Sequence, residues 1–216
     1  MKKAVVFGGS GLVGTALLYE LIANEDYDKV TAVLREYLPI SDSKLEQLIL
    51  MDFRHLLQLK GELEATDYFC CIGSTIKKAG SQEAFIQVDL DIPTSIAQMA
   101  MENFIPNLVV ISSLGANAAS FNFYLRTKGR MEESVRKIYF GNLKFIRPSL
   151  LIGERKEFRL GESMSMAFMW LFGWLLIGPL RRYRGIYASD VAKAMIKLTK
   201  YPPEMVVFES TELKGI

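Results

Sequence analysis

The chain has 216 residues, half of them hydrophobic, and its 26 basic and 24 acidic residues leave a formal net charge of only +2. This length suffices for one substantial core but is short for two independently stable domains. The hydrophobic content excludes a disordered chain, and the balanced charge excludes the strongly basic surface of a nucleic-acid-binding protein. We therefore expect a single domain, residues 1–216, that acts on a small-molecule substrate and has no nucleic-acid partner.

The first strand is predicted at Ala4–Phe7 and the first helix at Leu12–Ala23, with a glycine-rich loop between them. In a G-x-G-x-x-G loop, glycines allow a tight turn, close approach of the backbone to a pyrophosphate and close packing of helix on strand. The first N–H groups and the positive dipole end of the helix then face the anion. The alternative is a tight turn without a ligand. The predicted phosphate-binding residues are Gly8, Gly9, Ser10, Gly11, Leu12, Val13 and Gly14.

The second predicted strand, Val30–Leu34, ends at Arg35 and Glu36. An NAD-binding protein carries an acidic residue at this point, because a carboxylate binds the ribose 2′-hydroxyl. A guanidinium instead pairs with a 2′-phosphate through charge-assisted bonds. Arg35 therefore favours NADP(H) over NAD(H), whereas Glu36 argues the other way and a solvated surface charge is the alternative for Arg35.

The third and fourth strands are predicted at Leu48–Met51 and Tyr68–Ile72. Asp52 follows the third strand and is expected to accept a hydrogen bond from the adenine amino group or, alternatively, to cap a helix. Cys70 and Cys71 are adjacent, so a disulfide between them would be strained, and a metal site would lack further soft ligands. We expect no metal, no secretory leader and a cytoplasmic location.

Strands and helices continue to alternate through the middle of the chain. Helical period is seen over Gln82–Asn103 and Ala119–Ile138, and strand-like runs lie at Leu108–Ser112 and Leu143–Ile146. Strands that alternate with helices predict right-handed crossovers and a parallel sheet covered on both faces. The expected fold is α/β, a doubly wound parallel sheet.

A candidate catalytic set follows the fifth strand. Tyr124 lies four residues before Lys128, which places both on one face of a helix. The cation lowers the phenol pKa, so Tyr124 becomes a usable proton donor or acceptor at neutral pH. Ser113, at the carboxyl end of the strand, is expected to hydrogen-bond the substrate oxygen, with Ser112 as the alternative.

The alternation weakens from Pro148 onward, and residues 148–188 are predicted to form a small C-terminal appendage that covers the substrate. Within it, Ser163–Leu180 carries no charge and lies at the lower edge of the length that spans a membrane. Its glycines and proline favour a buried helix or the interface of a homodimer, and peripheral membrane contact is the alternative. A final amphipathic helix is predicted at Asp190–Tyr201.

The glycine loop, Ile111–Gly115, the Y-x-x-x-K pair at Tyr124–Lys128, and Arg147–Gly153 together resemble the extended and atypical short-chain dehydrogenase/reductase superfamily. Phe69–Thr75, Lys78–Gly80 and the dipeptide Val88-Asp89 are similar to its oxidoreductase branch named after the Tat-interacting protein.

This resemblance implies an NADP-binding Rossmann fold with a Ser-Tyr-Lys set, in which tyrosine relays the proton while hydride moves between nicotinamide and a carbonyl or alcohol carbon. It implies that Lys128 also holds the nicotinamide ribose. Glu36 departs from the branch, which can carry a second basic residue there. A dinucleotide-sensing regulator without turnover is the alternative function. The resemblance places dinucleotide contacts at Ser10, Arg35, Ile72, Gly73, Tyr124, Lys128, Leu151 and Arg159.

Overall fold

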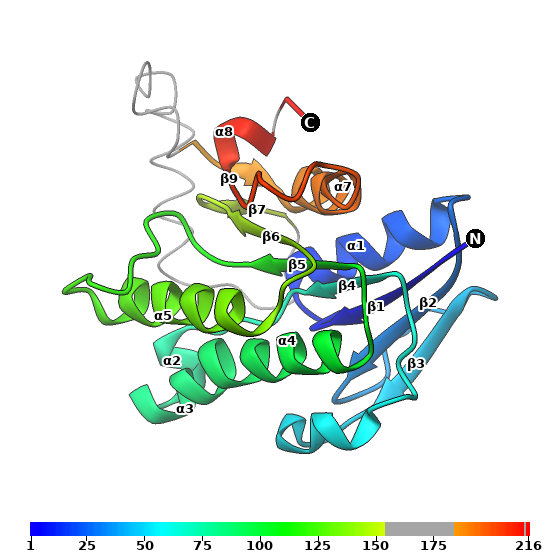
Figure 1. The fold of residues 1–216 in the computed structure, drawn as a ribbon, viewed down its shortest axis with the longest axis horizontal. Coiled ribbons are helices and arrows are strands. Elements are labelled where there is room, and N and C mark those ends of the chain that lie inside the picture. The colour runs from blue at the N-terminus through cyan, green and yellow to red at the C-terminus, as the bar shows by residue number, and fades with distance from the viewer. Residues whose placement is uncertain (154–183, 214) are drawn as a thin grey trace.

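The computed structural model describes residues 1–153, 184–213 and 215–216. Its main sheet has seven strands, all parallel, in the order β3-β2-β1-β4-β5-β6-β9 (Figure 1). The strand order reverses between β1 and β4, which creates the switch point where ligands bind in doubly wound sheets. The predicted α/β fold is confirmed. The strands are β1 (Lys2–Phe7), β2 (Tyr27–Leu34), β3 (Leu45–Ile49), β4 (Asp67–Cys70), β5 (Asn107–Ile111), β6 (Asn142–Arg147) and β9 (Val207–Glu209).

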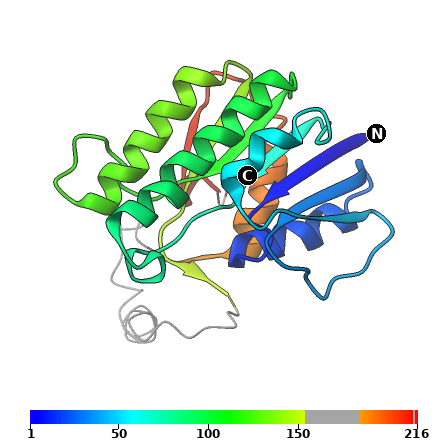
Figure 2. The same ribbon diagram turned by 90° about the horizontal axis from the view of Figure 1, so that it is seen from below.

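Helices cover both faces of the sheet. On one face α1 (Leu12–Ala23) packs against α7 (Ala188–Leu198), and on the other α4 (Ile92–Glu102) lies beside α5 (Phe123–Ile138) (Figures 1 and 2). The shorter elements are the 3-10 helix η1 (Phe53–Leu59), α2 (Ile76–Ala79), α3 (Gln82–Ile86), the π-helical turn η2 (Gln87–Asp91), α8 (Ser210–Leu213) and a small second sheet of β7 (Leu151–Ile152) and β8 (Ile186–Tyr187).

The core is divided by the sheet into two layers. Ala4 and Val6 of β1 lie in the layer under α1 and α7, and Val5 and Phe7 lie in the layer under α4 and α5. Successive residues of a strand point to opposite faces, so a strand buried on both sides must be apolar throughout. This explains why Ala4–Phe7, the buried part of β1, is a continuous apolar run before the glycine loop.

A buried polar cluster holds the amino ends of the strands together. Asp67, the first residue of β4, accepts hydrogen bonds from the Tyr27 hydroxyl at 2.5 Å and the Asn107 amide at 2.6 Å, and pairs with Lys2 at 3.2 Å. Burial, followed by the negative charge of Asp67, raises the pKa of Tyr27 well above its ordinary value. The cluster links four strands, β1, β2, β4 and β5, at the edge opposite the glycine loop.

Most predicted elements are present with shifted bounds, and three need correction. The third strand is Leu45–Ile49 rather than Leu48–Met51. The segment Gln82–Asn103 is interrupted by the π-helical turn η2. The helix predicted over Ala119–Ile138 begins only at Phe123, because the Asn122 side chain caps it by accepting from the Leu125 N–H at 3.1 Å.

For the C-terminal third the sequence predicts the appendage and one amphipathic helix. Instead, β9 pairs with β6 and adds a seventh strand to the main sheet. Of the predicted appendage, 148–188, the described residues form β7 and β8, whereas Ser163–Leu180 and Arg159 lie outside them. Among the helices that the structure describes, none has the length and apolarity needed to cross a bilayer.

Candidate functional site

The loop between β1 and α1 is wound as tightly as its glycines suggest. Gly8 has a φ of +82°, and a Cβ there would lie 2.9 Å from the Cys71 backbone. A Cβ on Gly14 would lie 2.2 Å from the Gly8 carbonyl oxygen. No side chain caps the N-terminus of α1 and no acidic residue lies in its first turn, so its first N–H groups remain for an anionic ligand.

Two further segments border this loop at the carboxyl edge of the sheet. Ile72 and Gly73 follow β4, where the Cys71 N–H donates to the Phe7 carbonyl at 2.8 Å. Ile72 is buried and Gly73 is exposed. Leu12 and Leu151 both pack against the core layer under α1. A Cβ on Gly8 would lie 2.9 Å from the Ile72 nitrogen, so the structure brings Ile72 against the loop, with Gly73 next to it in the chain.

Arg35 is exposed immediately after β2. Among the ion pairs of the described residues none involves Arg35, so its guanidinium is available to a ligand. Asp52 is already engaged: it caps η1 by accepting from the Arg54 N–H, and the Arg54 guanidinium binds its carboxylate at 2.6 Å. The hydrogen bonds and charge of Arg54 lower the pKa of Asp52 to about 2. The capping alternative for Asp52 is thus the one observed, and its contact with adenine stays a prediction.

Tyr124 lies in the first turn of α5, half-buried. Its ring packs on Phe85 of α3, with centroids 5.6 Å apart. Phe85 is fully buried and also contacts the Phe123 ring. The aromatic contacts fix the ring of Tyr124, while no hydrogen bond is found for its hydroxyl among the described residues, which leaves that group for a ligand.

Lys128, one turn later, is almost completely buried and forms an ion pair with Asp89 of η2, Nζ to Oδ1 2.7 Å. Burial alone would lower the pKa of Lys128, but the charge of Asp89, together with the nearby Tyr124 phenol, raises it above its ordinary value. The other oxygen of Asp89 accepts from the Ser74 N–H at 2.8 Å. Lys128 is therefore held as a charged group near the end of β4.

The two candidate serines are separated by the structure. Ser112 is buried, and its hydroxyl donates to Glu132 of α5 at 2.5 Å. Arg147 at the end of β6 binds the same carboxylate through two hydrogen bonds of 2.9 and 2.7 Å. Ser112 is thereby committed to a structural cluster, and Ser113 is the serine that remains open to a substrate.

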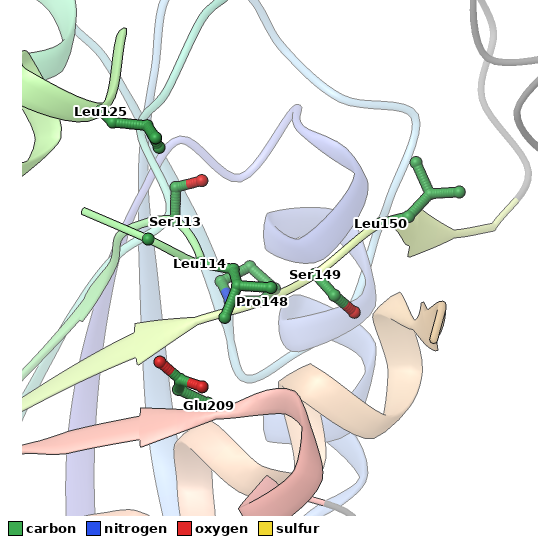
Figure 3. Close-up of a pocket in the computed structure, with 8 residues that line it drawn as sticks. Ser113, Leu114, Leu125, Pro148, Ser149, Leu150 and Glu209 are labelled. Atoms are coloured by element: carbon green, nitrogen blue, oxygen red, sulfur yellow. The ribbon is translucent and has the colours of Figure 1, made fainter. Parts of the chain in front are cut away.

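Ser113 lines a pocket of about 470 Å³ at the carboxyl edge of the sheet. Figure 3 shows Ser113 and Leu125 on one side of Pro148 and the Glu209 carboxylate on the other. Most of the lining is apolar, with the two serine hydroxyls and one carboxylate as the side-chain polar groups among the lining residues. The lining residues are Ser113, Leu114, Gly115, Leu125, Pro148, Ser149, Leu150 and Glu209.

Asp89 and Glu132 are two residues at this site to which the sequence analysis assigned no role. For each of them, the helical periodicity of the sequence indicates a position on a buried face. Asp89 lies four residues after the buried Phe85 and four before the buried Pro93, and therefore on the apolar stripe of its segment. Glu132 lies four residues after Lys128, on the same face of α5. A charged residue on a buried stripe needs a partner, and this need points to the ion pairs observed.

No family model matches the chain. The mitochondrial protein FMP52 of Candida albicans is 35% identical over 197 residues, which cover 88% of this chain and 85% of that protein. Protein HTATIP2 of Rattus norvegicus is 31% identical over 170 residues, which cover 77% of this chain and 70% of that protein.

Solved structures share the fold at low identity. L-threonine 3-dehydrogenase from Trypanosoma brucei superposes with a TM-score of 0.73 at 15% identity, covering 96% of this chain and 74% of that chain. The Bordetella bronchiseptica enzyme WbmH, in complex with NAD⁺, superposes with a TM-score of 0.71 at 15% identity, covering 100% of this chain and 78% of that chain. The chain thus shares its fold with L-threonine 3-dehydrogenase and with an enzyme solved in complex with NAD⁺.

One prediction from the sequence is wrong by these comparisons. A cytoplasmic location was expected, whereas the FMP52 proteins of Candida albicans and of three further species are named as mitochondrial. The expectation rested on two cysteines that form no disulfide. Unpaired cysteines report on redox conditions and do not distinguish one reducing compartment from another.

Proposed function

Because the chain belongs to the family of FMP52 and HTATIP2, within the atypical short-chain dehydrogenase/reductase superfamily, we propose that it is an NADP(H)-dependent oxidoreductase. Its substrate is a small or apolar carbonyl compound or the corresponding alcohol. The observation that carries this proposal is the β1–α1 loop, where a Cβ on Gly14 would lie 2.2 Å from the Gly8 oxygen. Such a loop has space for backbone only, and it presents free N–H groups to a diphosphate.

The residues around the loop fit a dinucleotide. Gly8–Gly14 and the uncapped N-terminus of α1 would hold the pyrophosphate, and the exposed segment at Gly73 would lie along the nicotinamide half. Arg35 supports NADP(H) over NAD(H), because an exposed guanidinium with no ion-pair partner among the described residues matches a 2′-phosphate. Glu36 beside it is exposed and solvated, so its charge is screened.

The bound nicotinamide would supply or accept the hydride, and this chain's own residues would manage the proton. Tyr124 is assigned as the general acid/base, since its hydroxyl has no hydrogen bond within the described part of the chain while its ring is held by Phe85. Lys128 would hold the nicotinamide ribose and stabilise negative charge on the phenol oxygen. Ser113 would donate a hydrogen bond to the substrate oxygen from the wall of the pocket.

The pocket supports the choice of substrate class. Leu114, Leu125, Pro148 and Leu150 form most of its wall, and an apolar wall favours the carbon skeleton of a small aldehyde, ketone or alcohol. The only charge among its lining residues is the Glu209 carboxylate, which would repel an anionic substrate.

The test has two steps. Titration with NADPH and NADH, followed by nucleotide fluorescence, is expected to show binding with preference for NADPH. A panel of small aldehydes and ketones is then incubated with NADPH, and consumption is followed by the loss of nicotinamide absorbance. Tyr124→Phe is expected to lower turnover about 10²–10⁴-fold with cofactor affinity unchanged.

Tyr19→Phe is the matched control, because Tyr19 is an exposed tyrosine on α1 and its variant should retain full turnover. Turnover by Tyr124→Phe equal to that of the wild type would remove the catalytic assignment. Binding of NADPH without its consumption by any compound would favour the sensor alternative, and absence of binding would contradict both functions.

A further inference from the structure

The buried ion pair between Asp89 and Lys128 has a position that a purely structural pair does not need. Replacing a buried ion pair by apolar residues of similar volume is often neutral or stabilising, so such a pair is weak evidence for a stabilising role. Here both side chains are at most 3% exposed, and the pair lies where β4 ends at the switch point of the sheet. This is the edge at which ligands bind in doubly wound folds.

Both oxygens of Asp89 are used, and each contacts a different part of the site. Oδ1 lies 2.7 Å from Lys128 Nζ, and Oδ2 accepts from the Ser74 N–H at 2.8 Å. The carboxylate therefore links the catalytic helix α5 to the segment that follows β4. A change in this link would move the lysine relative to that segment.

The lysine and the carboxylate are covered by a residue without a side chain. A Cβ on Gly73 would lie 3.4 Å from Asp89 Oδ1 and 3.5 Å from Lys128 Nζ, and Gly73 itself is exposed. Because residue 73 is a glycine, only backbone atoms separate the Lys128 ammonium from solvent at this point. A ligand lying along Gly73 would thus come within reach of the buried charge.

A local irregularity of the helix accompanies this arrangement. Asp89 lies in the middle of the π-helical turn η2, between α3 and α4. A π-helical turn inserts an extra residue and is found frequently at functional sites. It allows Phe85 on α3 to pack under Tyr124 while Asp89 faces Lys128, so one segment supports both residues of the Y-x-x-x-K pair.

We propose that Asp89 is a positioning residue of this site, whose carboxylate holds the charged Lys128 against the Gly73–Ser74 segment so that the lysine can bind the nicotinamide ribose. This inference rests on the proposed function and deepens it. The groups that face Lys128 are Asp89 from η2, Tyr124 from α5 itself and Cys70 from the end of β4. Burial raises the pKa of Cys70 to about 11, so Asp89 is the counter-charge.

The test is the variant Asp89→Asn, which retains the size of the side chain and removes its charge. Without the carboxylate, burial lowers the pKa of Lys128, and the lysine loses its charge at a lower pH. We expect the alkaline loss of NADPH affinity to move down by about 1–3 pH units relative to the wild type. Dissociation constants measured by fluorescence titration from neutral to strongly alkaline pH provide this readout.

Asp67→Asn is the matched control. Asp67 is equally buried and pairs with Lys2, but it lies at the amino edge of the sheet. This variant is expected to lower the melting temperature while leaving the pH dependence of NADPH binding unchanged. Asp89→Glu retains the charge, so its loss of NADPH affinity is expected to occur at the same alkaline pH as in the wild type. A residue that acts through packing alone would not give this recovery.

A second readout does not depend on nucleotide or turnover. In lysine-¹³C-labelled protein, the Cε resonance of Lys128 is expected to titrate at lower pH in Asp89→Asn than in the wild type. An unchanged midpoint would overturn the inference, and so would a shifted midpoint with unchanged pH dependence of NADPH binding.

The proposal and the function on which it rests fail separately. If the wild type binds NADPH without consuming it, and Asp89→Asn shows the expected pH shift in binding, the inference is supported and the oxidoreductase is contradicted. If Asp89→Asn does not fold, Gly73→Ala replaces it, because its Cβ closes the gap above Lys128. Unchanged NADPH affinity in Gly73→Ala would then refute the inference.

Discussion

Gly14→Ala is the sharpest test of the phosphate loop. The added Cβ would lie 2.2 Å from the Gly8 oxygen and 2.9 Å from Gly9 Cα. Favourable contacts of carbon atoms begin at roughly 3.5–4.0 Å, so the overlap exceeds what a rotamer change relieves. Because the opposing atoms are backbone, α1 must move away from the loop. Overpacking of this kind costs about 1–3 kcal/mol of folding stability.

The same displacement withdraws the first N–H groups of α1 from the pyrophosphate. A misplacement of about 1 Å in a positioned site costs on the order of 10²-fold, and we expect the dissociation constant for NADPH to rise by that factor. Fluorescence titration and the melting temperature are measured together, so that a loss of binding is separated from a loss of fold.

Gly61→Ala is the control for Gly14→Ala. Gly61 has a φ of +84° and open space around its Cβ position, and it precedes β4 at the amino edge of the sheet. The strained backbone alone costs about 1–2 kcal/mol, which matches the destabilisation of Gly14→Ala without touching the loop. If Gly14→Ala bound NADPH as tightly as Gly61→Ala, the phosphate site would not be at this loop.

Three further predictions concern other residues. Arg35→Ala is expected to weaken NADPH binding about tenfold and leave NADH binding unchanged, because it removes one charge-assisted contact; equal losses for both nucleotides would refute the 2′-phosphate contact. Glu132→Gln removes the anion bound by Arg147 and Ser112, which is expected to cost about 3 kcal/mol, or roughly 6–12 °C in melting temperature; a calorimetric scan that matches the wild type would contradict this. Lys144→Met leaves the carbonyls of Pro202 and Met205 without their buried donor, so about 2 kcal/mol should be lost in chemical denaturation while NADPH binding is retained.

The β1–α1 unit was predictable because its determinants are local. An apolar strand, a glycine loop and a helical period follow one another in the sequence, and the helix has the predicted bounds Leu12–Ala23. The position of Arg35 after β2 was predictable for the same reason. Such features depend on neighbours along the chain, which sequence patterns record directly.

The cluster of charges around α5 was not predictable, because its contacts join distant segments. Asp89 and Lys128 are 39 residues apart, and Ser112 and Glu132 are 20 residues apart. The sequence does not distinguish the two adjacent serines at the end of β5 as candidates for the substrate contact. The structure distinguishes them, because the Ser112 hydroxyl donates to Glu132. The last strand was missed for another reason, because β9 has only three residues and its assignment depends on pairing with β6.

Burial of charge does not by itself identify the functional site of this protein. The charged residues buried in the described part of the chain are Asp67, Asp89, Lys128, Glu132 and Lys144. Asp67 and Lys144 are satisfied by groups that hold strand ends and a surface loop together. Asp89, Lys128 and Glu132 instead lie at the carboxyl edge, two of them on the face of α5 that also carries Tyr124.

The two groups of buried charged residues therefore differ in the edge of the sheet at which they lie. In a parallel sheet the amino edge is closed by the chain itself, whereas the carboxyl edge at the switch point stays open to a ligand. A buried charge at the closed edge stabilises strand register, and its loss should appear only as reduced stability. A buried charge at the open edge that lies beside the predicted cofactor segment, as the Asp89–Lys128 pair does beside Gly73, should alter the binding of a nucleotide and its dependence on pH. The paired variants Asp67→Asn and Asp89→Asn separate these two consequences within one fold.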